Sequence, residues 1–370
     1  MTFPSPIQKT LESYELVLET SLESTQRSGA ATGSYNAQSM TEFLAWGEDG
    51  CFVVATTGVV ELEYAAIQKT VGIFDAPCRG TIQLTGPDRL ECVGRLTTQN
   101  IISMKPGDAR LAFVTSRKGT VIADVIVRVF ENKVLLDIDI NVVRQVCDHI
   151  NAYVVMEDVE IQNCTESTHW LWCLGPEAKD IVIGESCTGK ATVQPLPKEV
   201  VGVDGVAIMV SPEEVELVWN SLQQGGCNPI GWYALNMSRV ERLTPFFMID
   251  FDSSNLPHET SLIQSRVRFD KGCYLGQEIV ARMESLGQPK QKIMQVNMKT
   301  DALPIAGAQL WQDETTSGTP VGVVTSSAIS PIRGSVPTVI AMVSKKCNAP
   351  GTSVYTHVGS EVVEGAVQSI

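Results

Sequence analysis

The thiol of Cys273 is the side chain of this sequence with the clearest capacity for chemistry. It lies in a short segment from Lys271 to Glu278 that reads Lys-Gly-Cys-Tyr-Leu-Gly-Gln-Glu. A neighbouring lysine and the N-terminus of a following helix would both stabilise a thiolate, which is the reactive form of cysteine. The alternative is a buried, inert thiol, which is the usual state of a free cysteine.

The residues around Cys273 predict a loop followed by a helix. No helical or strand period runs through residues 268–275. From about Gly276 the apolar residues fall on one helical face, namely Ile279, Val280, Met283 and Leu286. Gly287 and Pro289 predict the end of that helix. The thiol is therefore expected just before a helix N-terminus.

Composition indicates a globular protein with two or three domains. The chain has 370 residues, of which 44% are hydrophobic and 19% charged. It contains no apolar run of about 18 residues, so no membrane span is expected, and its N-terminus lacks the pattern of a secretory signal. Ten cysteines without a Cys-x-x-Cys pair favour reduced thiols in the cytoplasm and disfavour a metal site held by this chain.

The charge of the chain restricts the class of partner. A net charge of −14 disfavours binding to a nucleic-acid backbone, which requires a basic surface. The best candidates for a local basic patch are Arg266, Arg268, Lys271 and Arg282. An acidic protein with one basic patch suits a small anionic ligand.

One arrangement of strand, Gly-Pro turn and acidic residue occurs twice. The first copy is Thr81–Asp88 and predicts a helix from Pro87; the second is Trp170–Glu177 and predicts a helix from Pro176. Further strands are predicted at residues 109–115, 121–130 and 134–140. Antiparallel strands interleaved with single helices predict an α+β fold with two related halves.

Residues beyond 288 predict a separate domain. Six short segments that favour strands are bounded by Gly, Pro and Asn, at residues 293–298, 309–312, 321–326, 338–343, 353–356 and 362–368. Such a pattern predicts a small barrel or sandwich. We therefore expect two domains, of residues 1–288 and 289–370.

The segment from Lys271 to Glu278 resembles the Lys-Gly-Cys-aromatic-x-Gly-Gln-Glu signature of YgfZ-type folate-binding proteins, relatives of the T-protein (aminomethyltransferase) of the glycine cleavage system. Residues 71–75, 119–127, 239–241 and 256–259 are similar to further segments of these families. The resemblance extends roughly from Tyr64 to the C-terminus. It implies a T-protein-like fold of three lobes around a central hole: two ferredoxin-like α/β lobes with antiparallel sheets and a C-terminal β-barrel. It also implies binding of tetrahydrofolate or a one-carbon derivative.

The resemblance implies roles for individual residues. Asp124 matches the second residue of a T-protein Asp-Asp pair that assists proton handling at folate nitrogens, and Ala123 replaces the first. Val203 stands where T-proteins have a glutamate that binds the pterin, and a valine cannot accept from its N–H groups. The candidate catalytic residues are then Cys273, Lys271 and Asp124, and the candidate folate-binding residues are Arg239, Glu241, Tyr274, Gln277 and Glu278.

Each of these residues also has a structural interpretation. The alternatives are a solvated Lys271, an Asp124 bonded to a neighbouring loop, Arg239 and Glu241 paired with each other or with the sheet, Tyr274 as a core anchor, and Gln277 and Glu278 bonded to the loop backbone.

Two functions from different classes follow from the resemblance. The first is a folate-binding accessory protein that supports iron–sulfur cluster assembly or repair and cluster-dependent tRNA modification, with assembly proteins or client enzymes as partners. In that role the thiolate would ligate iron transiently or accept a sulfur or methylene unit, because one cysteine cannot hold a cluster alone. The alternative is a folate-dependent aminomethyltransferase or demethylase of one-carbon metabolism. A third interpretation is a scaffold that no longer binds folate.

Overall fold

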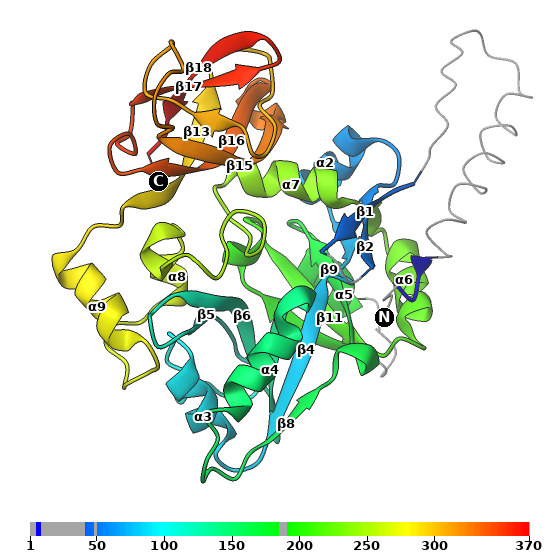
Figure 1. Cartoon of the computed structure of the whole chain (residues 1–370). Helices are drawn as coiled ribbons and strands as arrows, with labels where there is room; N and C mark the ends of the chain where they lie inside the picture. Colours follow the sequence, from blue (N-terminus) through cyan, green and yellow to red (C-terminus); the bar gives the residue numbers. More distant parts are fainter. Residues whose placement is uncertain (1–4, 9–40, 48–49, 185–190, 370) are drawn as a thin grey trace, which may run out of the picture. The chain divides into compact units, whose positions relative to one another are not determined.

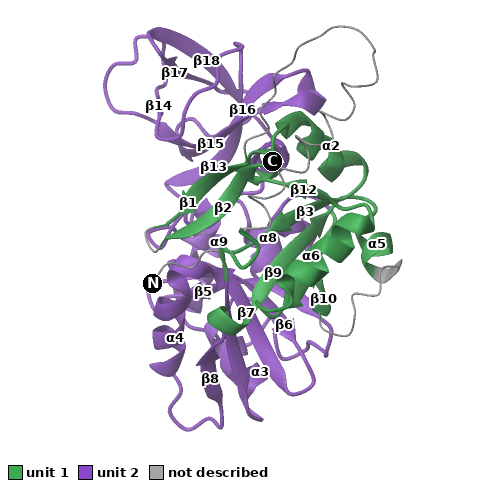
Figure 2. Cartoon of the chain, turned by 90° about the vertical axis from the view of Figure 1, so that its right-hand side faces the viewer, with its two compact units in different colours: residues 1–79, 165–196, 204–235 green, residues 80–164, 197–203, 236–370 purple. Residues whose placement is uncertain are grey.

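The computed structural model describes residues 5–8, 41–47, 50–184 and 191–369 (Figure 1). Leu11, Tyr14, Leu18 and Leu22 have the spacing of a helical face in the sequence, and this segment lies outside the described residues. Within the described residues, no helix is long and apolar enough to cross a membrane. The chain divides into two compact units, the first of residues 1–79, 165–196 and 204–235 and the second of residues 80–164, 197–203 and 236–370 (Figure 2).

The first unit contains a five-stranded sheet in the order β10-β11-β9-β3-β12. Its strands are β3 (Gly72–Asp75), β9 (His169–Leu174), β10 (Ala191–Leu196), β11 (Gly205–Val210) and β12 (Asn228–Ile230). Alternating residues of the strands, such as Leu171 and Ile208, form a core with α5 (Ala178–Gly184) and α6 (Val215–Gln224). The unit also holds α2 (Val60–Lys69) and the hairpin of β1 (Glu42–Trp46) and β2 (Cys51–Thr56).

The second unit contains a sheet in the order β5-β6-β7-β4-β8. Its strands are β4 (Arg79–Thr85), β5 (Ala109–Thr115), β6 (Val121–Val129), β7 (Lys133–Asp139) and β8 (Glu160–Asn163). The helices α3 (Arg89–Leu96) and α4 (Val143–Asn151) contribute to the same core. Strand β6 is buried along its whole length except at Asp124, which is partly exposed. Asp124 is therefore the partly exposed residue of an otherwise buried strand.

The C-terminal part of the second unit is a six-stranded sheet in the order β14-β15-β16-β13-β18-β17. Its strands are β13 (Gln291–Met298), β14 (Gln309–Leu310), β15 (Gly322–Ser330), β16 (Val336–Ser344), β17 (Ser353–Val358) and β18 (Glu361–Val367). Trp311, which follows β14, exchanges two backbone hydrogen bonds with Tyr355 of β17, of 2.8 and 2.9 Å. These bonds nearly close the sheet into a barrel, and the six strands predicted from the sequence are confirmed.

Three further helices and five short 3₁₀ turns are present among the described residues. The helices are α7 (Trp232–Glu241), α8 (Ile263–Arg266) and α9 (Gln277–Leu286), and the turns are η1 (Ile140–Val142), η2 (Thr165–Ser167), η3 (Lys198–Val200), η4 (Pro257–Glu259) and η5 (Pro331–Arg333). The predicted helix after Cys273 is confirmed as α9. Its N-cap is Gly276, which has φ +81°, and a Cβ there would lie 2.3 Å from the Ser116 oxygen. The predicted boundary between residues 288 and 289 falls in the connection from α9 to β13.

The repeated Gly-Pro turn is a structural repeat as well. Gly86 has φ +100° and a Cβ on it would lie 2.1 Å from the oxygen of Asp158; Gly175 has φ +129° and a Cβ would lie 2.4 Å from the oxygen of Thr70. Both positions therefore require glycine, for conformation and for space. The helices begin later than predicted, at Arg89 and Ala178, because each proline and acid lie in the turn itself.

Candidate functional site

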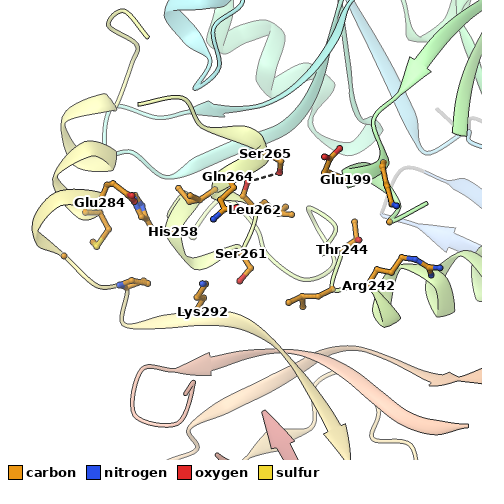
Figure 3. A pocket seen from close by; sticks show the side chains of 17 residues that line it. Glu199, Arg242, Thr244, His258, Ser261, Leu262, Gln264, Ser265, Glu284 and Lys292 are labelled. Atoms are coloured by element: carbon orange, nitrogen blue, oxygen red, sulfur yellow. Dashed lines mark hydrogen bonds and ion pairs between the residues drawn. The ribbon is translucent and has the colours of Figure 1, made fainter. Parts of the chain in front are cut away.

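A cavity of about 1020 Å³ lies in the second unit (Figure 3). Its walls come from η3, the C-terminal end of α7, the segment from η4 to α8, the end of α9 and the start of β13. A volume of this size is typical of small-molecule sites. None of the eight residues proposed from the sequence lines this cavity.

The cavity carries charged side chains of both signs. Lys198, Arg242 and Lys292 are its cations, and Glu199 and Glu284 are its acids. Arg242 lies at one end of the labelled group and Glu284 at the other (Figure 3). The Arg242 guanidinium donates to the oxygen and the hydroxyl of Ser238 at 3.2 and 3.1 Å. The cations of the lining can pair with acceptors on a ligand, and its acids can pair with donors on the same ligand.

His258 is a lining residue whose importance the sequence did not indicate. Its Nε2 lies 3.2 Å from Oε2 of Glu284, so an ionised Glu284 requires the proton on Nε2. Burial lowers the pKa of His258, although Glu284 acts in the opposite direction. The buried Nδ1 has no hydrogen-bond partner among the described residues. His258 thus offers an unsatisfied acceptor; the only sequence signal was its place in the family-like segment 256–259.

Asp124 forms an ion pair with Arg266 beside the cavity. Nε and Nη2 of Arg266 donate to the two carboxylate oxygens, each at 3.3 Å. Arg266 also donates to the oxygen of Glu199 at 3.0 Å and to Oγ of Ser265 at 2.7 Å, and both of these residues line the cavity. The Asp124 side chain is 17% exposed, whereas that of Arg266 is 1% exposed. The sequence identified Arg266 only as part of a basic patch.

Cys273 is exposed, and its loop is bonded to the end of α3. The backbone N–H of Arg268 donates to the oxygen of Thr98 and that of Leu275 to the oxygen of Arg95, both at 2.9 Å. The Lys271 ammonium donates to the oxygens of Gly94 and Thr97 at 2.5 and 2.6 Å. The loop therefore supplies donors to the oxygens of Gly94 and Arg95, which lie in the last turn of α3 and have no partner inside the helix, and to those of Thr97 and Thr98 just beyond it.

Lys271 and Tyr274 form a second contact within the loop. The Lys271 ammonium lies 5.0 Å from the centre of the Tyr274 ring, at a distance typical of a cation–π interaction. Burial lowers the pKa of Lys271 to about 8 and raises the pKa of Tyr274 to about 12. The Tyr274 hydroxyl is buried and has no partner in the part of the chain that the structure describes. Lys271 is thus not a solvated surface lysine, and its proposed effect on Cys273 stays a prediction.

Arg239 and Glu241 connect α7 to the barrel. Arg239 donates to Asp250 at 2.6 Å and to Oγ of Ser326 at 2.5 Å, and Glu241 accepts from Oγ of Ser330 at 2.7 Å. Both residues are buried, with 1% and 3% exposure. This matches the structural interpretation, in which the two side chains pair with the sheet. Their contact with folate stays a prediction.

The two remaining sequence candidates lie at the start of α9. Gln277 is half-buried and Glu278 is exposed in the first turn of α9. Val203, which the sequence resemblance places at the position of a pterin-binding glutamate, is buried at 7% exposure. Among the described residues, no group of three or more His, Cys, Asp or Glu side chains could hold a metal ion.

Comparison with protein families and curated sequences identifies relatives along most of the chain. Residues 28–194 match the family described as the GCVT N-terminal domain. A "Probable aminomethyltransferase" of Halobacterium salinarum is 26% identical over 345 residues, which cover 86% of this chain and 91% of the relative. An "Aminomethyltransferase" of Streptomyces coelicolor is 25% identical over 356 residues, which cover 90% of this chain and 91% of the relative.

Comparison with solved structures identifies the fold. The crystal structure of glycine cleavage system aminomethyltransferase T from Bartonella henselae matches with a TM-score of 0.79 at 18% identity, over 89% of this chain and 93% of that one. The T-protein-like α+β fold, with antiparallel sheets and a C-terminal barrel, is therefore confirmed. The N-terminal part of the chain is thus similar to the GCVT N-terminal domain, the sequence relatives are named aminomethyltransferases, and the structural likeness shows the fold.

Proposed function

We propose that this protein binds tetrahydrofolate and acts as a folate-dependent aminomethyltransferase of one-carbon metabolism. Sequence relatives that cover most of the chain bear the name aminomethyltransferase, which supports this class of reaction. The observation that carries the proposal is the charged cavity of about 1020 Å³ beside the Asp124–Arg266 pair.

The donor set of the cavity fits tetrahydrofolate. This molecule has N–H donors on its pterin ring and carboxylates on its glutamyl tail. Glu199, Glu284 and the unsatisfied Nδ1 of His258 supply acceptors for the ring. The cations Lys198, Arg242 and Lys292 would hold the carboxylates through charge-assisted hydrogen bonds.

The residues of this chain would bind, orient and exchange protons. When bound, tetrahydrofolate would supply two N–H nitrogens for the methylene carbon of an aminomethyl donor; one of their protons would leave with the amine as ammonia and the other with the rest of the donor. Asp124 would accept a proton from a ligand nitrogen at one carboxylate oxygen and return it later, which is general acid–base catalysis. Nδ1 of His258 would accept a hydrogen bond from an N–H group of the ligand.

Titration of tetrahydrofolate by calorimetry and an assay of methylene-tetrahydrofolate formation test this proposal. We expect binding, and turnover with an aminomethyl donor. Lys292→Met should weaken binding, whereas Lys346→Met, which changes an exposed lysine outside the cavity, should not. Binding without turnover favours the accessory function below, and no binding at millimolar ligand favours a scaffold that has lost folate.

A second candidate is a folate-binding accessory protein of iron–sulfur cluster assembly or repair, with assembly proteins or cluster-dependent tRNA-modifying enzymes as clients. It is favoured by the exposed thiol of Cys273 on a loop that resembles the YgfZ signature, and by Val203 at the pterin position. The free cysteines of the described residues support a reducing, cytoplasmic location.

Replacement of Cys273 by alanine tests the accessory function. The side chain is exposed, so Cys273→Ala should keep the circular dichroism spectrum and the unfolding midpoint of the wild type. We expect loss of support for cluster-dependent enzymes in cells that lack the natural protein. Full support by the variant would exclude a role for the thiol.

A further inference from the structure

Arg266 is a buried arginine at the junction of three elements around the cavity. It bonds Asp124 on β6, Glu199 on η3 and Ser265 on α8. We propose that Arg266 is a positioning residue, which fixes the Asp124 carboxylate beside the cavity so that it can accept an N–H group of a bound ligand. This inference rests on the proposed folate-binding function.

The geometry of the guanidinium explains how one residue can do this. Nε and Nη2 form a fork on the two oxygens of Asp124, Nη2 also reaches the oxygen of Glu199, and Nη1 reaches Oγ of Ser265. The planar guanidinium holds these donors in a fixed relation, and a lysine ammonium cannot reproduce a fork. Arg266 thereby fixes the position of Asp124 relative to Glu199 and Ser265, which line the cavity.

Asp124 retains capacity for a ligand. An ionised carboxylate has about four lone-pair sites, and Arg266 occupies one on each oxygen. The side chain is still 17% exposed, so a donor from outside the protein can reach it. The ligand class that fits is a small molecule with ring or amine N–H groups, such as a reduced pterin.

A double-mutant cycle tests whether Arg266 acts through Asp124. The variants are Arg266→Lys, Asp124→Ala and their combination, and tetrahydrofolate affinity is measured by calorimetry. Loss of one well-oriented hydrogen bond predicts that each single change weakens binding about tenfold. The combined variant should bind no more weakly than Asp124→Ala, because the carboxylate that Arg266 positions is then absent.

Arg268→Lys is the matched control, because Arg268 lies two residues further on and pairs with Asp270 on the surface, at 55% exposure. It should bind like the wild type. A merely structural role would let Arg266→Lys weaken binding equally with and without Asp124, and that result would overturn the proposal.

The cycle also works without ligand. If the wild type does not bind tetrahydrofolate, the proposed function fails, while urea unfolding of the same four proteins still measures the coupling between Arg266 and Asp124. Additive losses of stability would overturn the contact through which Arg266 positions Asp124; a clear coupling would support that contact in solution, and the affinity cycle alone tests positioning for a ligand.

Discussion

The Lys271 ammonium donates a hydrogen bond to the main-chain oxygen of Gly94 at 2.5 Å. Gly94 lies in the last turn of α3, where carbonyls have no partner within the helix and where a positive charge is favourable. The lysine of the family-like motif therefore holds the loop that carries Cys273 on the end of α3.

Lys271→Met should loosen the loop. Hydrogen bonds to a charged group contribute about 1.5–3 kcal/mol, so we expect the free energy of unfolding to fall by an amount of that order. Backbone amides of residues 268–275 should exchange faster, as measured by hydrogen–deuterium exchange. Lys118→Met is the control, because Lys118 is exposed in a neighbouring turn. Unchanged protection of residues 268–275 in Lys271→Met would show that the Lys271 hydrogen bonds do not hold this loop on α3.

The same lysine predicts a pH dependence of stability. Burial lowers the pKa of Lys271 from 10.5 to about 8. Between these two values the unfolded chain binds the proton and the folded chain does not, so this group makes the free energy of unfolding rise with pH. Below about pH 8 both states are protonated and the contribution is constant at its least favourable value. The free energy of unfolding of the wild type minus that of Lys271→Met should increase as pH rises above 8, as measured by urea unfolding at several pH values. A difference independent of pH would refute the assignment.

Arg239→Met should unfold the protein more readily rather than affect a ligand first. Arg239 is 1% exposed and its ion pair with Asp250 is buried. Breaking such a pair leaves an uncompensated charge and costs about 3–5 kcal/mol. Urea unfolding measures the loss, and Arg282→Met on the exposed face of α9 is the control. A variant with wild-type stability and weakened tetrahydrofolate binding would instead support the folate contact predicted from the sequence.

The Gly-Pro turn before α3 should tolerate no side chain. Gly86→Ala places a Cβ 2.1 Å from the oxygen of Asp158, at φ +100°. Gly107 has a similar φ of +94° with nothing within 4 Å, so Gly107→Ala isolates the conformational cost of about 1–2 kcal/mol. We expect Gly86→Ala to cost at least twice as much, because backbone at the start of β8 must move. Equal unfolding midpoints for the two variants would show that the close approach is relieved without cost.

Local patterns predicted most of the elements correctly. Strand β5 has the predicted bounds, Ala109–Thr115, and α9 and the six barrel strands lie where apolar periodicity and turn residues predicted them. The short strands β3 and β12 were not predicted. β12 has three residues and contains Pro229, and it is a strand because it pairs in parallel with β3.

The sequence by itself determined most of the helices and strands, the class of the fold and the two places where chemistry was expected, Cys273 and Asp124. Only the tertiary structure decided what these residues contact. Lys271 and Gly94 are separated by 177 residues in the chain, and Arg266 and Asp124 by 142. Periodicity reports the neighbours of a residue within a few turns, because it arises from local backbone geometry. The cavity and the contact of Lys271 with α3 are formed by segments that are distant in the sequence and meet only when the chain has packed.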